Sequence, residues 1–125
     1  MKKNLTLSSL GHTWILDLDG SIVKHNGYKI NGEDTLLNGA EEFLKSIPEN
    51  DMIIFLTSRK LEYKKITEDF LNRNHIKYDY IIYEVPYGER ILINDDKPSG
   101  LKMAHVVNSK RDGEVDISIH INEEG

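Results

Sequence analysis

The chain contains no cysteine, and this absence excludes several kinds of chemistry. Disulfide bonds, thiolate metal sites and thiol nucleophiles all need a sulfur atom that is not there. The chain also has no apolar run near the roughly 20 residues that a membrane-spanning helix needs. Two aspartates follow the basic N-terminal tip before a signal peptide could be completed. We therefore expect a cytoplasmic protein with no membrane partner.

An excess of basic residues is missing as well. Sixteen lysines and arginines stand against 21 aspartates and glutamates, for a net charge of −5. Nucleic-acid binding normally needs a basic face, so we expect no nucleic-acid partner. A phosphorylated ligand must then be held by local groups, because the overall charge repels it. The length of 125 residues and a hydrophobic content of 38% predict a single soluble folded domain spanning residues 1–125.

The sequence does contain an alternation of apolar runs and amphipathic segments. The apolar runs predict strands, and a 3.6-residue periodicity predicts helices. The polar stretch 21–38 is typical of a hairpin or flap. We expect strands at 12–16, 52–56, 80–83 and 91–93, a further candidate at 104–107, an edge strand at about 115–121, and helices at about 40–47 and 60–74. This order predicts an α/β fold, a Rossmann-like three-layer sandwich with a mainly parallel sheet.

Polar side chains directly follow three of these apolar runs. They are the pairs Asp17 and Asp19, Thr57 and Ser58, and 95–96 (Asp-Asp). In an open parallel sheet the ligand crevice lies outside the carboxyl ends of the strands, so the three clusters are expected to converge there. The i, i+2 spacing places the first two carboxylates on one side of a strand, where they need a cation such as Mg²⁺.

Such a cluster suits phosphoryl transfer. One aspartate can attack phosphorus and form an aspartyl-phosphate, and a second can move the protons. A magnesium ion shields the nucleophile from the charge of the phosphate, while a threonine or serine hydroxyl donates a hydrogen bond to it.

Three motifs resemble those of the haloacid dehalogenase superfamily. Residues 17–20 (Asp-Leu-Asp-Gly) resemble motif I, 55–59 (Phe-Leu-Thr-Ser-Arg) motif II, and 93–96 (Ile-Asn-Asp-Asp) motif IV. They stand in the family's order over residues 12–98. The short length, the Thr-Ser-Arg form of motif II and the segment 78–83 are similar to small phosphatases of capsule and surface-polysaccharide synthesis.

The resemblance implies a Mg²⁺-dependent phosphatase without a large cap domain. It implies Asp17 as nucleophile and metal ligand, and Asp19 as acid and base that binds the metal through its backbone carbonyl. Asp95 is the remaining implied metal ligand, with Asp96 as the alternative. The implied phosphate-binding residues are Leu18, Thr57, Ser58 and Lys97.

The chain departs from the family at motif III, which contributes a lysine. The corresponding region, 83–90, contains none. We expect Arg90 to begin the fourth strand and so to lie at the wrong end of the sheet. Lys97, just after the acidic pair, is the expected replacement.

Several alternatives stay open. The first aspartate pair could cap a turn, Ser58 could cap the following helix, and 95–96 could form an exposed turn. A phospho-accepting receiver domain has a similar length and layering, but its acceptor aspartate ends the third strand, and no aspartate ends 80–83. A catalytically inactive, ligand-binding relative is a third possibility.

The flap, 21–38, is too short to form a separate cap, so the site is expected to be open. We expect either a large phosphorylated substrate, such as a sugar-linked intermediate, or a homo-oligomer in which a neighbouring chain covers the site.

Overall fold

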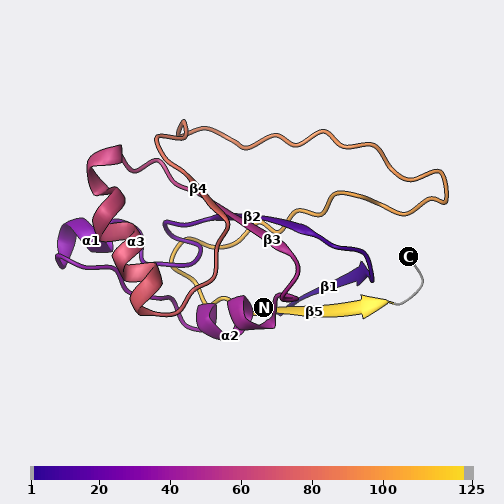
Figure 1. Cartoon of the computed structure of the whole chain (residues 1–125), viewed down its shortest axis with the longest axis horizontal. Helices are drawn as coiled ribbons and strands as arrows, with labels where there is room; N and C mark the ends of the chain where they lie inside the picture. The colour runs from indigo at the N-terminus through magenta and orange to yellow at the C-terminus, as the bar shows by residue number, and fades with distance from the viewer. Residues whose placement is uncertain (1, 123–125) are drawn as a thin grey trace.

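A computed structural model describes residues 2–122 of the chain. Parallel strands and helices form an open α/β arrangement, drawn in Figure 1. The elements in chain order are β1 (Lys3–Ser8), β2 (Thr13–Asp17), α1 (Gly27–Ile30), α2 (Ala40–Ser46), β3 (Met52–Leu56), the 3₁₀ helix η1 (Leu61–Tyr63), α3 (Lys64–Arg73), β4 (Tyr80–Ile82) and β5 (Ile117–Asn122).

The central sheet has the strand order β2-β3-β4, with all three strands parallel. β3 lies in the middle and buries alternate side chains, with Phe55 0% and Ile53 2% exposed. The register pairs Asp17 with Leu56, and Leu56 with Ile82. The three strands therefore end side by side, and the residues that follow them share one edge of the sheet.

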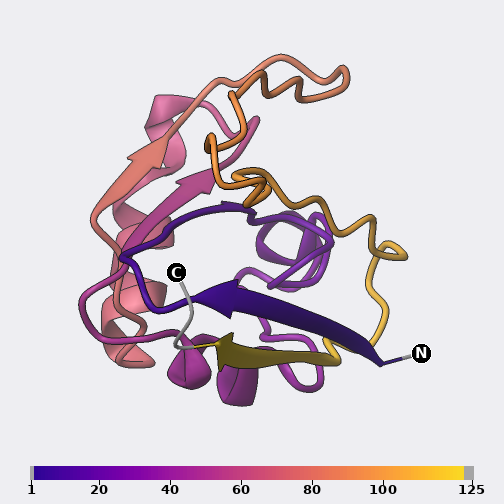
Figure 2. The ribbon, with the colours of Figure 1, turned by 90° about the vertical axis from the view of Figure 1, so that its right-hand side faces the viewer.

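The two ends of the described chain form a second, parallel pair, β1 with β5. Figure 2 shows these two strands side by side, below the three-stranded sheet. The predicted C-terminal edge strand is confirmed, although β5 runs from 117 to 122 rather than from 115 to 121. The sequence pattern did not predict β1, whose partner strand lies more than a hundred residues away in the chain.

The predicted helices at 40–47 and 60–74 are confirmed as α2 and as η1 followed by α3. Figure 1 shows α1 and α3 together at one end of the molecule. The rings of Tyr28 and Tyr63 pack edge to face, with their centroids 5.0 Å apart. Trp14 and Phe43 meet edge to face in the core at 5.8 Å. No helix in residues 2–122 is long and apolar enough to cross a membrane.

The predicted strand at 91–93 is wrong. These residues lie in the long connection between β4 and β5, where the side chains of Ile91 and Ile93 are 85% and 92% exposed. Figure 1 shows this connection as an open loop that extends well beyond the sheet. An apolar run becomes a strand only where a sheet edge accepts its backbone and another layer covers its side chains. The segment 104–107 does not form a strand either.

The flap, residues 21–38, is a hairpin-like excursion with α1 near its tip. Its two arms are joined by hydrogen bonds from Lys24 N–H to Thr35 C=O at 2.9 Å and from Leu37 N–H to Ile22 C=O at 2.9 Å. The expectation of a hairpin or flap is confirmed. The returning arm carries Asp34, whose side chain points into the protein and is buried.

Candidate functional site

The aspartate pair stands where β2 ends and turns into the flap. Asp17 is the last residue of β2, and the Leu18 N–H donates to the Leu56 carbonyl at 3.0 Å, which extends the sheet by one residue. Gly20 then adopts φ +84°, a left-handed conformation that other residues rarely adopt, and its N–H donates to the Val23 carbonyl at 2.7 Å. This turn directs Asp19 towards the end of β3.

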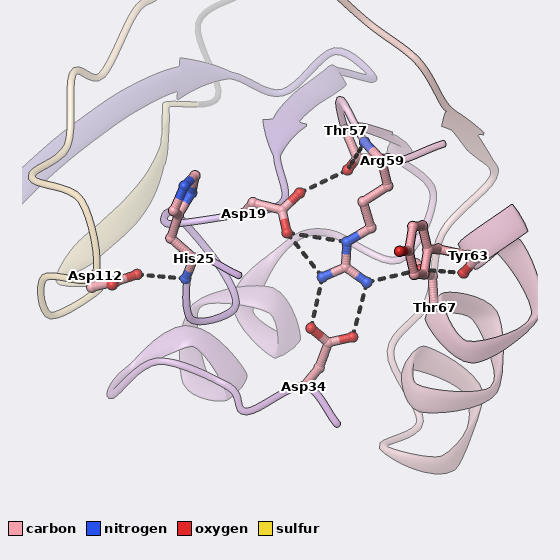
Figure 3. Close-up of polar contacts among 8 residues, drawn as sticks. All are labelled: Asp19, His25, Asp34, Thr57, Arg59, Tyr63, Thr67 and Asp112. Carbon is pink, nitrogen blue, oxygen red and sulfur yellow. Dashed lines mark hydrogen bonds and ion pairs between the residues drawn. The ribbon is translucent and has the colours of Figure 1, made fainter. Parts of the chain in front are cut away.

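Both carboxylate oxygens of Asp19 accept hydrogen bonds from the residues that follow β3. Oδ2 accepts from the hydroxyl of Thr57 at 2.7 Å. Oδ1 accepts from Nε and Nη2 of Arg59 at 3.1 and 2.9 Å. Figure 3 shows the three side chains converging from the two strand ends. Asp19 therefore serves as more than a turn residue, and the predicted meeting of Asp19 with Thr57 is confirmed.

Arg59 is the most deeply buried charge at this site, with only 3% of its surface exposed. Besides Asp19, its guanidinium donates to Asp34 through Nη1 at 3.0 Å and Nη2 at 2.6 Å, and to the hydroxyl of Thr67 at 2.8 Å. The ring of Tyr28 lies 3.9 Å from Cζ. Burial alone would lower the pKa of Arg59, but the hydrogen bonds and negative charges of Asp34 and Asp19 raise it above its ordinary value. The guanidinium therefore stays positively charged.

Sequence reasoning missed the contribution of Arg59 and Asp34. Arg59 was visible as the third residue of the Thr-Ser-Arg segment, but an arginine after a strand is ordinarily solvated. Asp34 gave no signal, because it stands in a polar flap and its partner is 25 positions away in the chain.

Asp17 faces the solvent more than Asp19 does. Its Oδ2 accepts from the hydroxyl of Ser21 at 2.9 Å, and its Oδ1 accepts from Nη1 of Arg90 at 3.1 Å. The side chains of Asp17 and Arg90 are 38% and 39% exposed. An accessible carboxylate with a cation beside it can receive a phosphate group.

The expectation that Arg90 lies at the wrong end of the sheet is therefore wrong. Because 91–93 is not a strand, Arg90 does not stand at the beginning of one. The open loop instead returns its side chain to the carboxyl end of β2. The same connection touches the turn again at Asp112, whose N–H donates to the Gly20 carbonyl at 2.8 Å and whose Oδ1 accepts from the His25 N–H at 2.8 Å.

The structure does not bring the motif IV residues to this cluster. Asp96 pairs with Lys102 within the exposed loop, at 2.6 Å. Lys97 lies in a turn of the same loop, where its N–H donates to the Leu101 carbonyl at 3.0 Å. Within residues 2–122 no three acidic or histidine side chains form a group that could hold a metal, so Asp95 does not join Asp17 and Asp19. The reason is the missing fourth strand, which was expected to deliver Asp95.

Two of the predicted phosphate-binding residues are engaged elsewhere. Leu18 is 1% exposed, and its N–H belongs to the β2–β3 ladder. The hydroxyl of Ser58 donates to the Val85 carbonyl at 2.7 Å, so it does not cap the following helix. Thr57 is also fully buried, but its hydroxyl contacts Asp19 directly.

The donors that remain fit a magnesium ion that binds together with a substrate. Mg²⁺ keeps several waters and is commonly held by one or two carboxylates plus phosphate oxygens. The exposed carboxylate of Asp17 suits this mode of binding. The side-chain oxygens of Asp19 are already hydrogen-bonded to Arg59 and Thr57, so they are less available to an ion.

A scan against protein-family models finds no match, and a search of curated proteins finds none either. Among solved structures, a chain of the Pnkp1/Rnl/Hen1 complex is similar to this one, with 28% sequence identity and a TM-score of 0.51. The match covers 66% of this chain and 31% of that chain, so this chain corresponds to under a third of its neighbour's length. A likeness of this extent assigns no family.

Proposed function

We propose that the protein is a Mg²⁺-dependent phosphatase of the haloacid dehalogenase type, with a Rossmann-like core and no large cap. It hydrolyses a phosphomonoester through an aspartyl-phosphate on Asp17. The observation that supports this most strongly is the pairing of an exposed Asp17 with an Asp19 fixed by Thr57, at the carboxyl edge of a parallel sheet. The motifs indicate a phosphorylated sugar, or a sugar-linked intermediate of capsule or surface-polysaccharide synthesis, as substrate.

The proposed reaction has two steps. Asp17 attacks phosphorus, the bond from phosphorus to the leaving oxygen breaks, and Asp19 gives that oxygen a proton. Asp19 then takes a proton from the water that attacks the aspartyl-phosphate, which releases inorganic phosphate and restores Asp17. Mg²⁺ would neutralise charge between Asp17 and the phosphate oxygens.

We assign the role of the missing motif III lysine to Arg90 rather than to Lys97. The guanidinium of Arg90 already lies at Asp17, whereas Lys97 belongs to a turn of the exposed loop. Arginine can hold two phosphate oxygens at once, so it suits this place. The hydroxyl hydrogen of Thr57, which the structure directs to Asp19, would turn to the phosphate when substrate binds.

A catalytically inactive, ligand-binding relative remains the second candidate. The observation that favours it is the lack, within residues 2–122, of a carboxylate group assembled around a metal. A receiver domain gains no support, because β4 is followed by Tyr83, whose hydroxyl donates to Glu68 at 2.9 Å.

The experiment is a screen for phosphate release from p-nitrophenyl phosphate and a panel of sugar phosphates, with Mg²⁺ and with a chelator. We expect release that needs Mg²⁺. In the same screen, Arg90→Ala should lower kcat/KM by about 10²-fold, the usual loss for one group that stabilises a transition-state charge. The matched control Lys97→Ala should leave the rate unchanged. Phosphate release from no substrate would contradict the phosphatase and favour the ligand-binding candidate.

A further inference from the structure

We propose that Asp34 and Arg59 are positioning residues that fix the carboxylate of Asp19, and that they connect the flap to the acid–base step. The role given to Asp19 rests on the proposed function. The contacts themselves, drawn in Figure 3, stand independently of it.

Arg59 is saturated with hydrogen bonds inside the protein. A guanidinium has five N–H donors. In Arg59, Nε donates to Asp19, Nη1 to Asp34 and Thr67, and Nη2 to Asp19 and Asp34. No donor remains for a phosphate oxygen, and the residue is 97% covered by the protein because only 3% is exposed. Its role is therefore to hold other protein groups rather than to bind the substrate.

The guanidinium is itself held by three residues, two from the flap and one from α3. Asp34, on the returning arm of the flap and 6% exposed, accepts hydrogen bonds from both terminal nitrogens of Arg59. Thr67 of α3 accepts from Nη1 and passes its own hydrogen to the Tyr63 carbonyl at 2.8 Å. Tyr28 of α1 packs its ring against the cation. A planar group fixed from three sides defines a direction for Asp19 that a lysine could not reproduce.

This arrangement makes the two oxygens of Asp19 different. Oδ1 carries two hydrogen bonds from Arg59, whereas Oδ2 has only the hydroxyl of Thr57. That hydroxyl has a single hydrogen, and its oxygen already accepts a hydrogen bond from the backbone N–H of Arg59 at 3.1 Å. Oδ2 is therefore the less engaged of the two oxygens, and we assign to it the proton transfer of the proposed reaction.

The test uses two substrates that differ in their need for an acid. p-Nitrophenolate leaves without a proton, whereas the alkoxide of a sugar phosphate needs one. Asp34→Asn places an amide donor against the guanidinium, and Arg59→Lys removes the planar group. The second step, in which Asp19 acts as base, is the same for both substrates, so the comparison uses kcat/KM, which reports only the steps up to the aspartyl-phosphate. In both variants kcat/KM for the sugar phosphate should fall by about 10²-fold, the lower range for general acid catalysis. With p-nitrophenyl phosphate, kcat/KM should fall far less.

The matched control is Glu33→Gln, which removes an exposed carboxylate next to Asp34 in the chain. It should behave as the wild type. The ratio of the two rates does not depend on the folded fraction, because unfolding lowers both rates equally. Equal losses of kcat/KM on the two substrates would overturn the positioning role.

A second measurement separates this proposal from the phosphatase itself. The Nε–H proton of Arg59 should exchange slowly with water in the wild type, and markedly faster in Asp34→Asn, as followed by NMR. If the wild type hydrolyses neither substrate, the proposed function fails, and the exchange rate alone decides whether Asp34 fixes Arg59. An unchanged exchange rate in Asp34→Asn would overturn the connection.

Discussion

At the scale of single residues, the two arginines at the site differ in burial, and this difference gives them different roles. Arg59 is 3% exposed and every donor is used within the protein, whereas the side chain of Arg90 is 39% exposed and meets one carboxylate. Replacing Arg59 by lysine therefore loses a planar group whose side-chain donors are all used, whereas Arg90 keeps donors available for a ligand. The sequence indicated Asp17, Asp19 and Thr57 because each follows an apolar run. It could not indicate Asp34, whose importance depends on a contact between distant segments.

A second buried aspartate supports the opposite end of the sheet. Asp51 is 4% exposed and accepts hydrogen bonds from the His12 N–H at 3.0 Å, from Nδ1 of His12 at 2.8 Å and from Nε1 of Trp14 at 2.9 Å. Burial raises the pKa of Asp51, but the hydrogen bonds from Trp14 and His12 outweigh it and hold the pKa below its ordinary value. The ionised form is therefore favoured by folding.

The pKa shift of Asp51 makes a contribution to stability that depends on pH. A lowered pKa stabilises the fold above the unfolded value of about 4, and this stabilisation is lost as the pH falls through the folded pKa. Asp51→Asn should lower the free energy of unfolding at neutral pH by about 1–3 kcal/mol. The difference from the wild type should shrink below about pH 4 in urea titrations. Asp69→Asn, in an exposed pair with Lys65, is the control, and an unchanged acid slope in Asp51→Asn would contradict the expectation.

At the scale of elements, an apolar run predicted a strand correctly only where the fold supplies a partner. β3 was predicted from Met52 to Leu56 and is found there, between two parallel neighbours. The similar run 91–93 stays in an exposed loop. β1 went unnoticed because its pairing with β5 depends on the opposite end of the chain. A local sequence pattern shows which segments could form a strand, but a strand forms only where a neighbouring strand pairs with its backbone.

The junction between the flap and α2 depends on Gly39. It adopts φ +84°, and a methyl group there would overlap the carbonyl oxygen of Val115. The left-handed backbone costs a non-glycine residue about 1–2 kcal/mol, and forcing atoms into a filled space adds about 1–3. Gly39→Ala should therefore lower the free energy of unfolding by about 2–5 kcal/mol.

Gly32 provides the matched control for Gly39. It adopts a similar φ of +78°, but a methyl group there meets no atom within 4 Å. Gly32→Ala should cost only the backbone contribution of about 1–2 kcal/mol. Urea unfolding of the two variants measures the difference, and equal costs would show that the contact with Val115 does not matter.

At the scale of the whole molecule, the site is gathered from three separate regions. The three-stranded sheet supplies Asp17 and Thr57 at its carboxyl edge, the flap supplies Asp34, and the long β4–β5 connection supplies Arg90. Figures 1 and 2 show this connection reaching outward before it returns to β5. The general position of the site followed from the rule for parallel sheets. The rule did not predict that Arg90 is the cationic side chain at Asp17, because a loop rather than a strand brings it there.

The central claim is that Asp17 carries the phosphoryl group. The most direct measurement is to quench the wild type with acid during turnover of p-nitrophenyl phosphate with Mg²⁺, and to locate the trapped phosphoryl group by mass spectrometry. We predict that it lies on the peptide that contains Asp17 and that Asp17→Asn shows neither the adduct nor phosphate release. Full phosphate release by Asp17→Asn, or an adduct on another residue, would contradict the claim.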